Sequence, residues 1–207
     1  MSQEKDIVQV LSEGTYDLPL FLKYLKGFAV DGSQPERALL LGILMQSLAR
    51  FHLSDFTACM CLVPSHVQES PSVENELNYI YELENLLSCG EFTKFWQQWG
   101  VVKEHLPESF NFETGVRTSI LESISFTVEK IQRARLATYL GVAVEQLDQT
   151  IANAKDQGGE FACSCEQDEV RFSRNTFNHP EGNTNQETVK FKDVLSILQC
   201  TNVLPVS

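Results

Sequence analysis

The sequence is poor in basic residues. Its 207 residues include 16 Lys and Arg against 28 Asp and Glu, so the formal net charge is −12 and the pI is about 4.7. Nucleic acids and acidic membranes attract proteins through Lys and Arg, so this balance argues against direct binding to either. An acidic chain can still work inside a ribonucleoprotein machine if protein neighbours make the RNA contacts.

Long apolar runs are also missing. No stretch is long enough to span a bilayer, and the N-terminus MSQEKDIVQV lacks the basic start and apolar core of a signal peptide. We therefore expect no contact with a membrane and a cytoplasmic location.

Enzyme and metal motifs are absent as well. There is no P-loop, no G-x-G-x-x-G and no G-x-S-x-G, and the four histidines lie outside any H-E-x-x-H setting. Cys59 and Cys61, like Cys163 and Cys165, form C-x-C pairs, whereas zinc knuckles prefer C-x-x-C. We expect reduced structural thiols, no metal and no cofactor. An enzyme that uses Cys61 with His66 is an alternative, but we interpret this pair as a buried thiol near a surface imidazole.

What the sequence does contain, over residues 1–110, is helical periodicity. Asp17 is placed to cap one helix, and Ser33 to cap a second helix that is apolar on most sides and should therefore be central and buried. A short helix is expected around Ser54–Leu62. Two further helices have as inward residues Leu77, Ile80, Tyr81, Leu83 and Leu87, and then Phe92, Phe95, Trp96 and Trp99. Successive helix pairs predict a helical-repeat domain over 1–110. We expect the four aromatic residues of its last helix to pack in the hydrophobic core of this domain.

Residues 111–175 follow a different pattern. A long helix is expected at Glu113–Glu129, then a helix that starts near Ile131 and ends at Gly141, a second helix, and two alternating strands. The residues on one face of the two strands are Phe161, Cys163 and Cys165, and Val170 and Phe172. This order predicts a winged helix, so the fold class is mostly α.

The second helix of this winged helix is acidic. Residues 144–156 contain three carboxylates and one lysine, and the corner at 166–169 adds three more carboxylates. A helix that reads DNA must enter a groove lined with phosphates, which such a charge opposes. We therefore expect no direct DNA binding, and expect the helix and strand edge to bind another protein.

The end of the chain is expected to hold a loop and a helix. Residues 176–190 are polar and predict a flexible loop, and 191–207 a C-terminal helix and tail. The apolar side of that helix consists of Phe191, Val194, Leu195 and Leu198. It could pack back on the winged helix or join a bundle made with other chains.

Helical repeats that lead into a terminal winged helix resemble the PCI family, which builds the proteasome lid, the signalosome and translation initiation factor 3. The phrase SDFTACMCL (Ser54–Leu62) and the pattern L-x-x-L-L-x-x-x-x-F-x-x-F-W (Leu83–Trp96) are most similar to the subunit K family of eukaryotic translation initiation factor 3. The similarity runs from about Tyr16 to Gln199. Two departures are a short N-terminus, where we expect the family's N-terminal helix to be trimmed, and a longer loop at Arg174–Thr188.

This resemblance implies a non-catalytic scaffold subunit that supports assembly of the initiation complex on the small ribosomal subunit. Its implied partners are other subunits of the factor, especially subunit L, and the ribosomal subunit through the complex. PCI subunits pair through the edges of their winged-helix sheets and gather their last helices in a bundle. The implied edge is Phe161–Cys165 with Val170–Phe172, and the implied bundle helix is Phe191–Leu198. A PCI subunit of the proteasome lid or signalosome, or a nucleic-acid-binding winged helix, stays open as an alternative.

Overall fold

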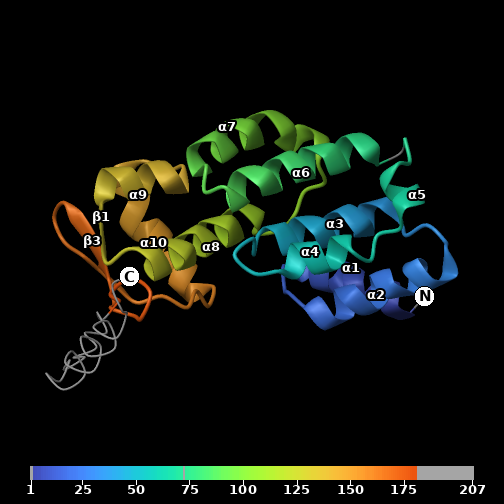
Figure 1. Ribbon diagram of the computed structural model, residues 1–207, viewed down its shortest axis with the longest axis horizontal. Coiled ribbons are helices and arrows are strands. Elements are labelled where there is room, and N and C mark those ends of the chain that lie inside the picture. The colour runs from blue at the N-terminus through green and yellow to red at the C-terminus, as the bar shows by residue number, and fades with distance from the viewer. Residues whose placement is uncertain (1, 72, 181–207) are drawn as a thin grey trace, which may run out of the picture.

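The computed structural model describes residues 2–71 and 73–180, and within them the protein is mostly helical, as predicted. Its helices are α1 (Ser2–Glu13), α2 (Leu18–Asp31), α3 (Arg37–Leu48), α4 (Asp55–Met60), α5 (Ser65–Gln68), α6 (Glu74–Ser88), α7 (Phe92–Val102), α8 (Phe112–Thr127), α9 (Arg133–Leu140) and α10 (Leu147–Asp156), with 3-10 turns η1 (Lys103–His105) and η2 (Val144–Gln146). The strands are β1 (Lys130–Gln132), β2 (Cys163–Cys165) and β3 (Glu169–Phe172). Figure 1 shows an elongated molecule with α1–α5 at one end, α9, α10 and the sheet at the other, and α8 between them.

Helix α3 is the centre of the helical array, a name we use for α1–α7. Every residue from Leu39 to Leu48 is buried, and α3 contacts α1, α2, α4, α6 and α8. A helix surrounded on all sides has no polar face, which is why its sequence is apolar all round, and the prediction of a central helix is confirmed. Ser33 as its cap is wrong, because the chain stays extended through Glu36 (φ −60°, ψ 126°) and the helix begins at Arg37.

The start of the described chain forms a helix that packs on its neighbours. Helix α1 spans Ser2–Glu13, and its Ile7 is fully buried where α1 contacts α2 and α3. After a short turn, Asp17 caps α2 as predicted, since its Oδ1 accepts a hydrogen bond of 3.0 Å from the Leu20 N–H. Helix α1 therefore packs against both α2 and α3.

Helices α6 and α7 pack against each other, and α6 packs on α3. Leu77, Ile80, Leu83 and Leu87 of α6 are buried as predicted. Tyr81 was predicted to point inward but is 40% exposed, because its hydroxyl donates to Gln68 Oε1 at 3.2 Å at the surface. On α7, Phe95 is fully buried, whereas Phe92, Trp96 and Trp99 are partly buried.

Helix α8 is close to its predicted span and leads into a unit that we call the sheet unit (residues 130–172: β1, α9, α10, β2 and β3). Its sheet has the order β1-β3-β2, and both pairings are antiparallel. Ile131 was predicted in the first helix, but it lies in β1 opposite Val170, so α9 begins two residues later, at Arg133. The predicted end of that helix is confirmed, since Gly141 adopts the left-handed conformation at φ 62°. Phe161 lies just before β2 rather than within it.

The segment after β3 is described as far as Pro180. The side-chain amides of Asn175 and Asn178 each donate to the Ser125 carbonyl at 2.9 Å, so this turn is bound to the end of α8. The rest of the predicted loop and the predicted terminal helix with Phe191, Val194, Leu195 and Leu198 lie outside the described residues. Among the helices that are described, none has the length and apolarity needed to cross a membrane.

Candidate interaction surface

The middle strand of the sheet cannot serve as a docking edge. Val170 and Phe172 belong to β3, which is paired with β1 on one side and β2 on the other. Their side chains are 0% and 2% exposed. The expectation that Val170–Phe172 offers a free edge is therefore wrong, because both sides of its backbone are occupied and its apolar side chains fill the core.

Strand β2 does lie at an edge, and its hydrogen bonds show which backbone groups face outward. The Glu166 N–H donates to the Glu169 carbonyl at 2.8 Å, and the Ser173 N–H to the Ala162 carbonyl at 2.9 Å. In an antiparallel ladder such residues alternate with residues whose backbone groups point away. The N–H groups of Cys163 and Cys165 therefore face the outer side of β2, where no further strand pairs within residues 2–71 and 73–180.

The side chains of Lys155 and Cys165 lie near this edge. Lys155 Nζ is 3.5 Å from the Cys163 carbonyl oxygen and 6.0 Å from the ring centre of Phe161. A lysine beside an edge strand hinders unwanted pairing, yet its flexible side chain can move aside for a specific partner. Desolvation by neighbouring atoms, followed by a hydrogen bond with Asp148, raises the pKa of the Cys165 thiol, although the side chain is exposed. The edge thus presents a neutral thiol rather than a thiolate.

The predicted burial of the cysteines is only partly correct. Cys59 is buried, and burial raises the pKa of its thiol to about 11. Cys61 was expected to be buried but is exposed, as is Cys165, while Cys163 is half-buried. No group of three His, Cys, Asp or Glu residues in the described part of the chain is close enough to hold a metal ion.

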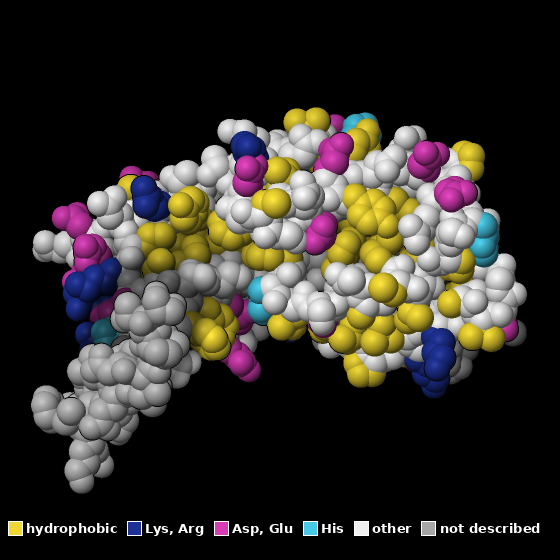
Figure 2. All heavy atoms as spheres, viewed as in Figure 1, with side chains coloured by type: hydrophobic (Ala, Val, Ile, Leu, Met, Phe, Trp, Pro, Cys, Tyr) yellow, Lys and Arg dark blue, Asp and Glu magenta, His cyan; other side chains and the backbone are white. Residues whose placement is uncertain are grey.

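Three arginines of the sheet unit and its flanks are paired with carboxylates. Arg133 binds Asp148 at 2.9 Å, Arg171 binds Glu166 at 3.2 Å, and Arg174 binds Glu129 at 3.2 Å. Figure 2 shows acidic and basic side chains next to each other at this end of the molecule. Guanidinium groups already bound to carboxylates are poorly placed to meet phosphates.

Two of the contacts that attach the sheet unit to α8 and the helical array are polar. At the first, the Trp96 Nε1–H donates to the Tyr139 carbonyl at 2.8 Å, and Arg117 Nε donates to the Leu140 carbonyl at 3.1 Å. The Arg117 guanidinium also lies 4.6 Å from the centre of the Trp96 ring. These donors satisfy carbonyl groups that the end of α9 leaves unpaired. The predicted core role of the aromatic cluster thus includes holding the two parts together.

At the second contact, Glu122 of α8 joins two distant segments. Its Oε2 lies 3.0 Å from His52 Nε2, and its Oε1 accepts the Glu160 N–H at 2.8 Å. His52 follows α3, and Glu160 precedes β2. His52 Nδ1 is buried and has no hydrogen-bond partner among the described residues.

This second contact predicts a pH dependence of stability. Burial lowers the pKa of His52 below its usual 6.5, although Glu122 acts in the opposite direction. The folded protein therefore binds fewer protons at His52 than the unfolded chain in the window just below 6.5, so the free energy of unfolding falls as the pH drops through it. We expect His52→Gln to flatten this dependence in urea unfolding measured at about pH 7.5 and about pH 5.5. His66→Gln, at an exposed position, is the control, and a steeper dependence in His52→Gln would contradict the assignment.

Strand β1 forms the other edge of the sheet and was not predicted from the sequence. Three residues, Lys130–Gln132, are too few to show alternation. The Phe172 N–H donates to the Glu129 carbonyl and the Arg133 N–H to the Asp168 carbonyl, so the N–H groups of Lys130 and Gln132 point outward. The sheet therefore has two candidate docking edges.

Known proteins are similar to this sequence over most of its length. The chain is 28% identical to eukaryotic translation initiation factor 3 subunit K of Homo sapiens and of Mus musculus over 169 residues, which cover 79% of this chain and 76% of each relative. It is 25% identical to the subunit K of Yarrowia lipolytica over 189 residues, which cover 88% of this chain and 78% of the relative. A family model described as the CSN8/PSMD8/EIF3K family matches residues 36–157. Because this match includes the central helix α3, the α6–α7 pair, α8, α9 and α10, more than half of the chain, the protein belongs to the CSN8/PSMD8/EIF3K family.

Proposed function

We propose that this protein is a non-catalytic scaffold subunit of eukaryotic translation initiation factor 3. It supports assembly of the initiation complex on the small ribosomal subunit, in the cytoplasm, through protein–protein contacts. The observation that carries the proposal is the similarity to subunit K over 79% of the chain. The open sheet edge is a feature that suits a subunit of a larger assembly.

The proposal includes a division of the chain. Residues 1–110 form a helical-repeat domain and residues 111–175 a winged helix, followed by a loop (176–190) and a terminal helix with its tail (191–207). Support for the winged helix comes from the element order β1-α9-α10-β2-β3 and from the three-stranded antiparallel sheet. Support for the helical repeats comes from the packing of α6 against α7 and of α3 against both α4 and α6.

The proposed partners are other subunits of the factor, with subunit L pairing at the edge of β2. Phe161, Cys163 and Cys165 position this edge, whereas Val170 and Phe172 support it from the core. The terminal helix with Phe191, Val194, Leu195 and Leu198 is proposed to join a shared bundle. The small ribosomal subunit is reached through the complex, and the paired arginines of the sheet unit support a role without direct DNA binding.

Proline at Cys165 tests the proposed edge. A proline there removes an outward N–H, which an edge strand tolerates, and its ring obstructs an added strand. We expect about tenfold weaker retention of subunit L in pull-downs, since one or two lost inter-strand hydrogen bonds cost about 1–3 kcal/mol. Ser164→Pro is a poor test, because Ser164 faces β3 in the register and its loss would damage the hairpin itself.

Two matched variants control this experiment. Cys165→Val keeps the N–H and should retain subunit L. Gln132→Pro removes an outward N–H of β1. Gln132 has φ −66°, which is the angle that proline favours, so the substitution fits the backbone. If Gln132→Pro alone releases subunit L, the docking edge is β1 and the assignment to β2 is wrong. If neither proline variant has an effect in a folded protein, pairing by sheet edges is wrong.

Identification of the co-purified chains also tests the assembly itself. Tagged protein from cell extract is expected to retain subunits of translation initiation factor 3. Retention of proteasome-lid or signalosome subunits instead would favour the alternative assemblies of the same family.

A further inference from the structure

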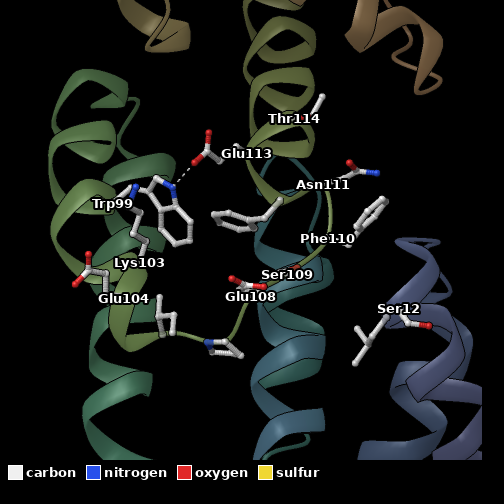
Figure 3. A pocket seen from close by; sticks show the side chains of 14 residues that line it. Ser12, Trp99, Lys103, Glu104, Glu108, Ser109, Phe110, Asn111, Glu113 and Thr114 are labelled. Atoms are coloured by element: carbon white, nitrogen blue, oxygen red, sulfur yellow. Dashed lines mark hydrogen bonds between the residues drawn. The ribbon is translucent and has the colours of Figure 1, made fainter.

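A second surface lies far from the sheet, where α1, η1 and the start of α8 meet. A cavity of about 880 Å³ opens there. Figure 3 shows Trp99 reaching into it from α7 on one side, and Phe110 and Ser12 on the other. The apolar residues that line it are Leu11, Trp99, Leu106, Pro107, Phe110 and Phe112. We call this cavity the Phe110 groove.

Phe110 is exposed, yet it is held in place. Its side chain is 56% exposed, and its ring lies so close to the Gly14 backbone that a Cβ at Gly14 would come 2.2 Å from Phe110 Cδ1. Gly14 itself has φ 66°. Part of the ring is therefore packed against the turn after α1, and the rest of it is exposed at the groove.

The backbone around Phe110 is fixed as well. Gln46, a buried polar residue of α3, donates through Nε2 to the Phe110 carbonyl and to Ser109 Oγ, both at 3.0 Å. Asn111 is the one residue other than glycine with positive φ (59°) in the described part of the chain. A core helix thus determines the conformation of a surface loop. An aromatic side chain held rigid before binding loses little conformational entropy when a partner covers it.

The walls of the groove are also ordered, and its rim is acidic. The Trp99 Nε1–H donates to Glu113 Oε1 at 3.0 Å, and Arg117 holds the other oxygen of Glu113 at 3.0 Å. On the rim, Glu104 and Glu108 are exposed carboxylates with no ion pair among the described residues, against one exposed Lys103. The rim therefore favours basic side chains in whatever binds.

We propose that the Phe110 groove binds an amphipathic segment of a partner protein. An apolar side chain of the segment packs on the exposed part of the Phe110 ring, and Lys or Arg residues of the segment meet Glu104 and Glu108. This recognition uses a rigid aromatic anchor within an apolar groove and a charged rim, which is the arrangement of interfaces whose energy is concentrated in few residues. The site is separate from the sheet edge and goes beyond the pairing proposed there.

A displayed library of random peptides of about 16 residues tests this chemistry, since that length forms four turns of helix. Peptides are selected on the full chain and then measured on variants by fluorescence anisotropy. We expect enriched peptides to combine apolar residues with Lys or Arg. Phe110→Ser should weaken them about tenfold or more, and so should the double variant Glu104→Lys, Glu108→Lys, which alters only exposed side chains. Val101→Ser, at a residue 67% exposed on α7 and outside the groove, should leave them unchanged.

Several results would overturn the proposal. The first is a set of selected peptides whose affinity does not change in Phe110→Ser, and the second is a set that is acidic. The third is a synthetic peptide of residues 189–200 of this chain that binds more tightly than any selected peptide. Concentration-dependent dimers that Phe110→Ser abolishes would assign the groove to a second copy.

Hydrogen exchange in a purified assembly provides the second measurement. Residues 104–114 are expected to exchange more slowly in the assembly than in the free chain. If an assembly forms and this segment is not protected, the groove proposal fails while the scaffold function stands. If no assembly forms, the scaffold function fails, and the peptide measurement decides the groove by itself.

Discussion

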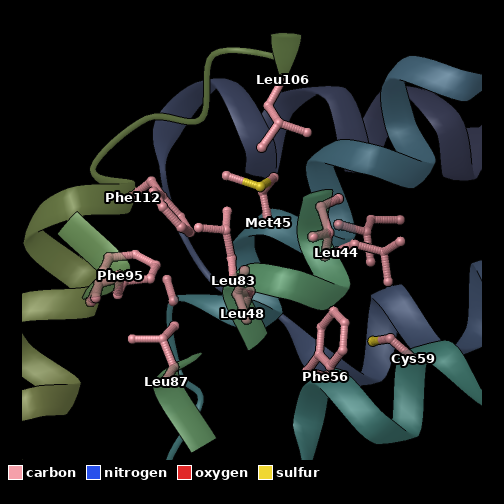
Figure 4. Close-up of a cluster of buried hydrophobic side chains, with 14 of the residues drawn as sticks. Leu44, Met45, Leu48, Phe56, Cys59, Leu83, Leu87, Phe95, Leu106 and Phe112 are labelled. Carbon is pink, nitrogen blue, oxygen red and sulfur yellow. The ribbon is translucent and has the colours of Figure 1, made fainter. Parts of the chain in front are cut away.

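Replacing Phe95 with alanine is expected to lower the free energy of unfolding by about 3–5 kcal/mol. Phe95 is fully buried in the cluster that also contains Leu83, Leu87 and Phe112, as Figure 4 shows. Its ring meets the Trp96 ring edge-on, with 5.0 Å between the ring centres. Alanine leaves a cavity that the surrounding helices cannot close, because α6, α7 and α8 are fixed by their other contacts. Urea unfolding followed by circular dichroism measures the loss.

A neighbouring position on the same helix is the control. Thr93 is exposed on α7, and Thr93→Ala is expected to change the free energy of unfolding by no more than about 0.5 kcal/mol. Equal losses for the two variants would show that α7 does not pack through Phe95, which would contradict the arrangement of the whole α6–α7 pair.

The helices could be predicted from the sequence where one side of each helix meets the core. In α6 the residues Leu77, Ile80, Leu83 and Leu87 repeat at helical spacing because they pack on α3, and a linear pattern records this. Tyr81 shares that spacing but lies at the rim, where its hydroxyl binds Gln68. Periodicity gives the direction of a side chain but not the depth of the core at that point.

Features that depend on distant contacts could not be predicted in the same way. Strand β1 exists because residues 130–132 pair with β3 some forty residues later, and Ile131 within it also fits a helical pattern. Because β1 pairs with β3, β3 is the middle strand of the sheet. The two open edges are therefore β1 and β2. Cys163 and Cys165 were predicted at an edge and lie in the edge strand β2. Val170 and Phe172 were also predicted at an edge, but the side of β3 that would be open is paired with β1.

The Phe110 groove gave no signal in the sequence. Gly14, Gln46 and Phe110 belong to three separate elements, and their contacts arise only when α1, α3 and the loop before α8 meet. An exposed phenylalanine in a loop is ordinary by itself, since isolated apolar side chains are common on surfaces. It becomes informative when buried groups are seen to fix its position.

Alanine at Gly141 is expected to lower the free energy of unfolding by about 3 kcal/mol, as the sum of two effects. Gly141 has φ 62°, a conformation that costs other residues about 1–2 kcal/mol. A Cβ there would also lie 2.7 Å from Trp96 Cγ, and such overpacking costs about 1–3 kcal/mol. The clash lies at the contact of α7 with α9, so the substitution strains the attachment of the sheet unit. Urea unfolding again measures the loss.

The two effects on stability at Gly141 can be separated within this chain. Gly90 has φ 72°, and among the described residues no atom lies within 4 Å of the position that a Cβ would take, so Gly90→Ala reports the backbone effect alone. The difference between the two glycine variants is then the clash with Trp96. In a Trp96→Ala background the added cost of Gly141→Ala should fall to that of Gly90→Ala, a coupling of about 1–2 kcal/mol. If the coupling is zero, the indole does not pack against the end of α9. The candidate docking edge would then be held in its orientation to the helical array by Arg117, by Glu122 and by the packing of α10 on α8, rather than by the indole.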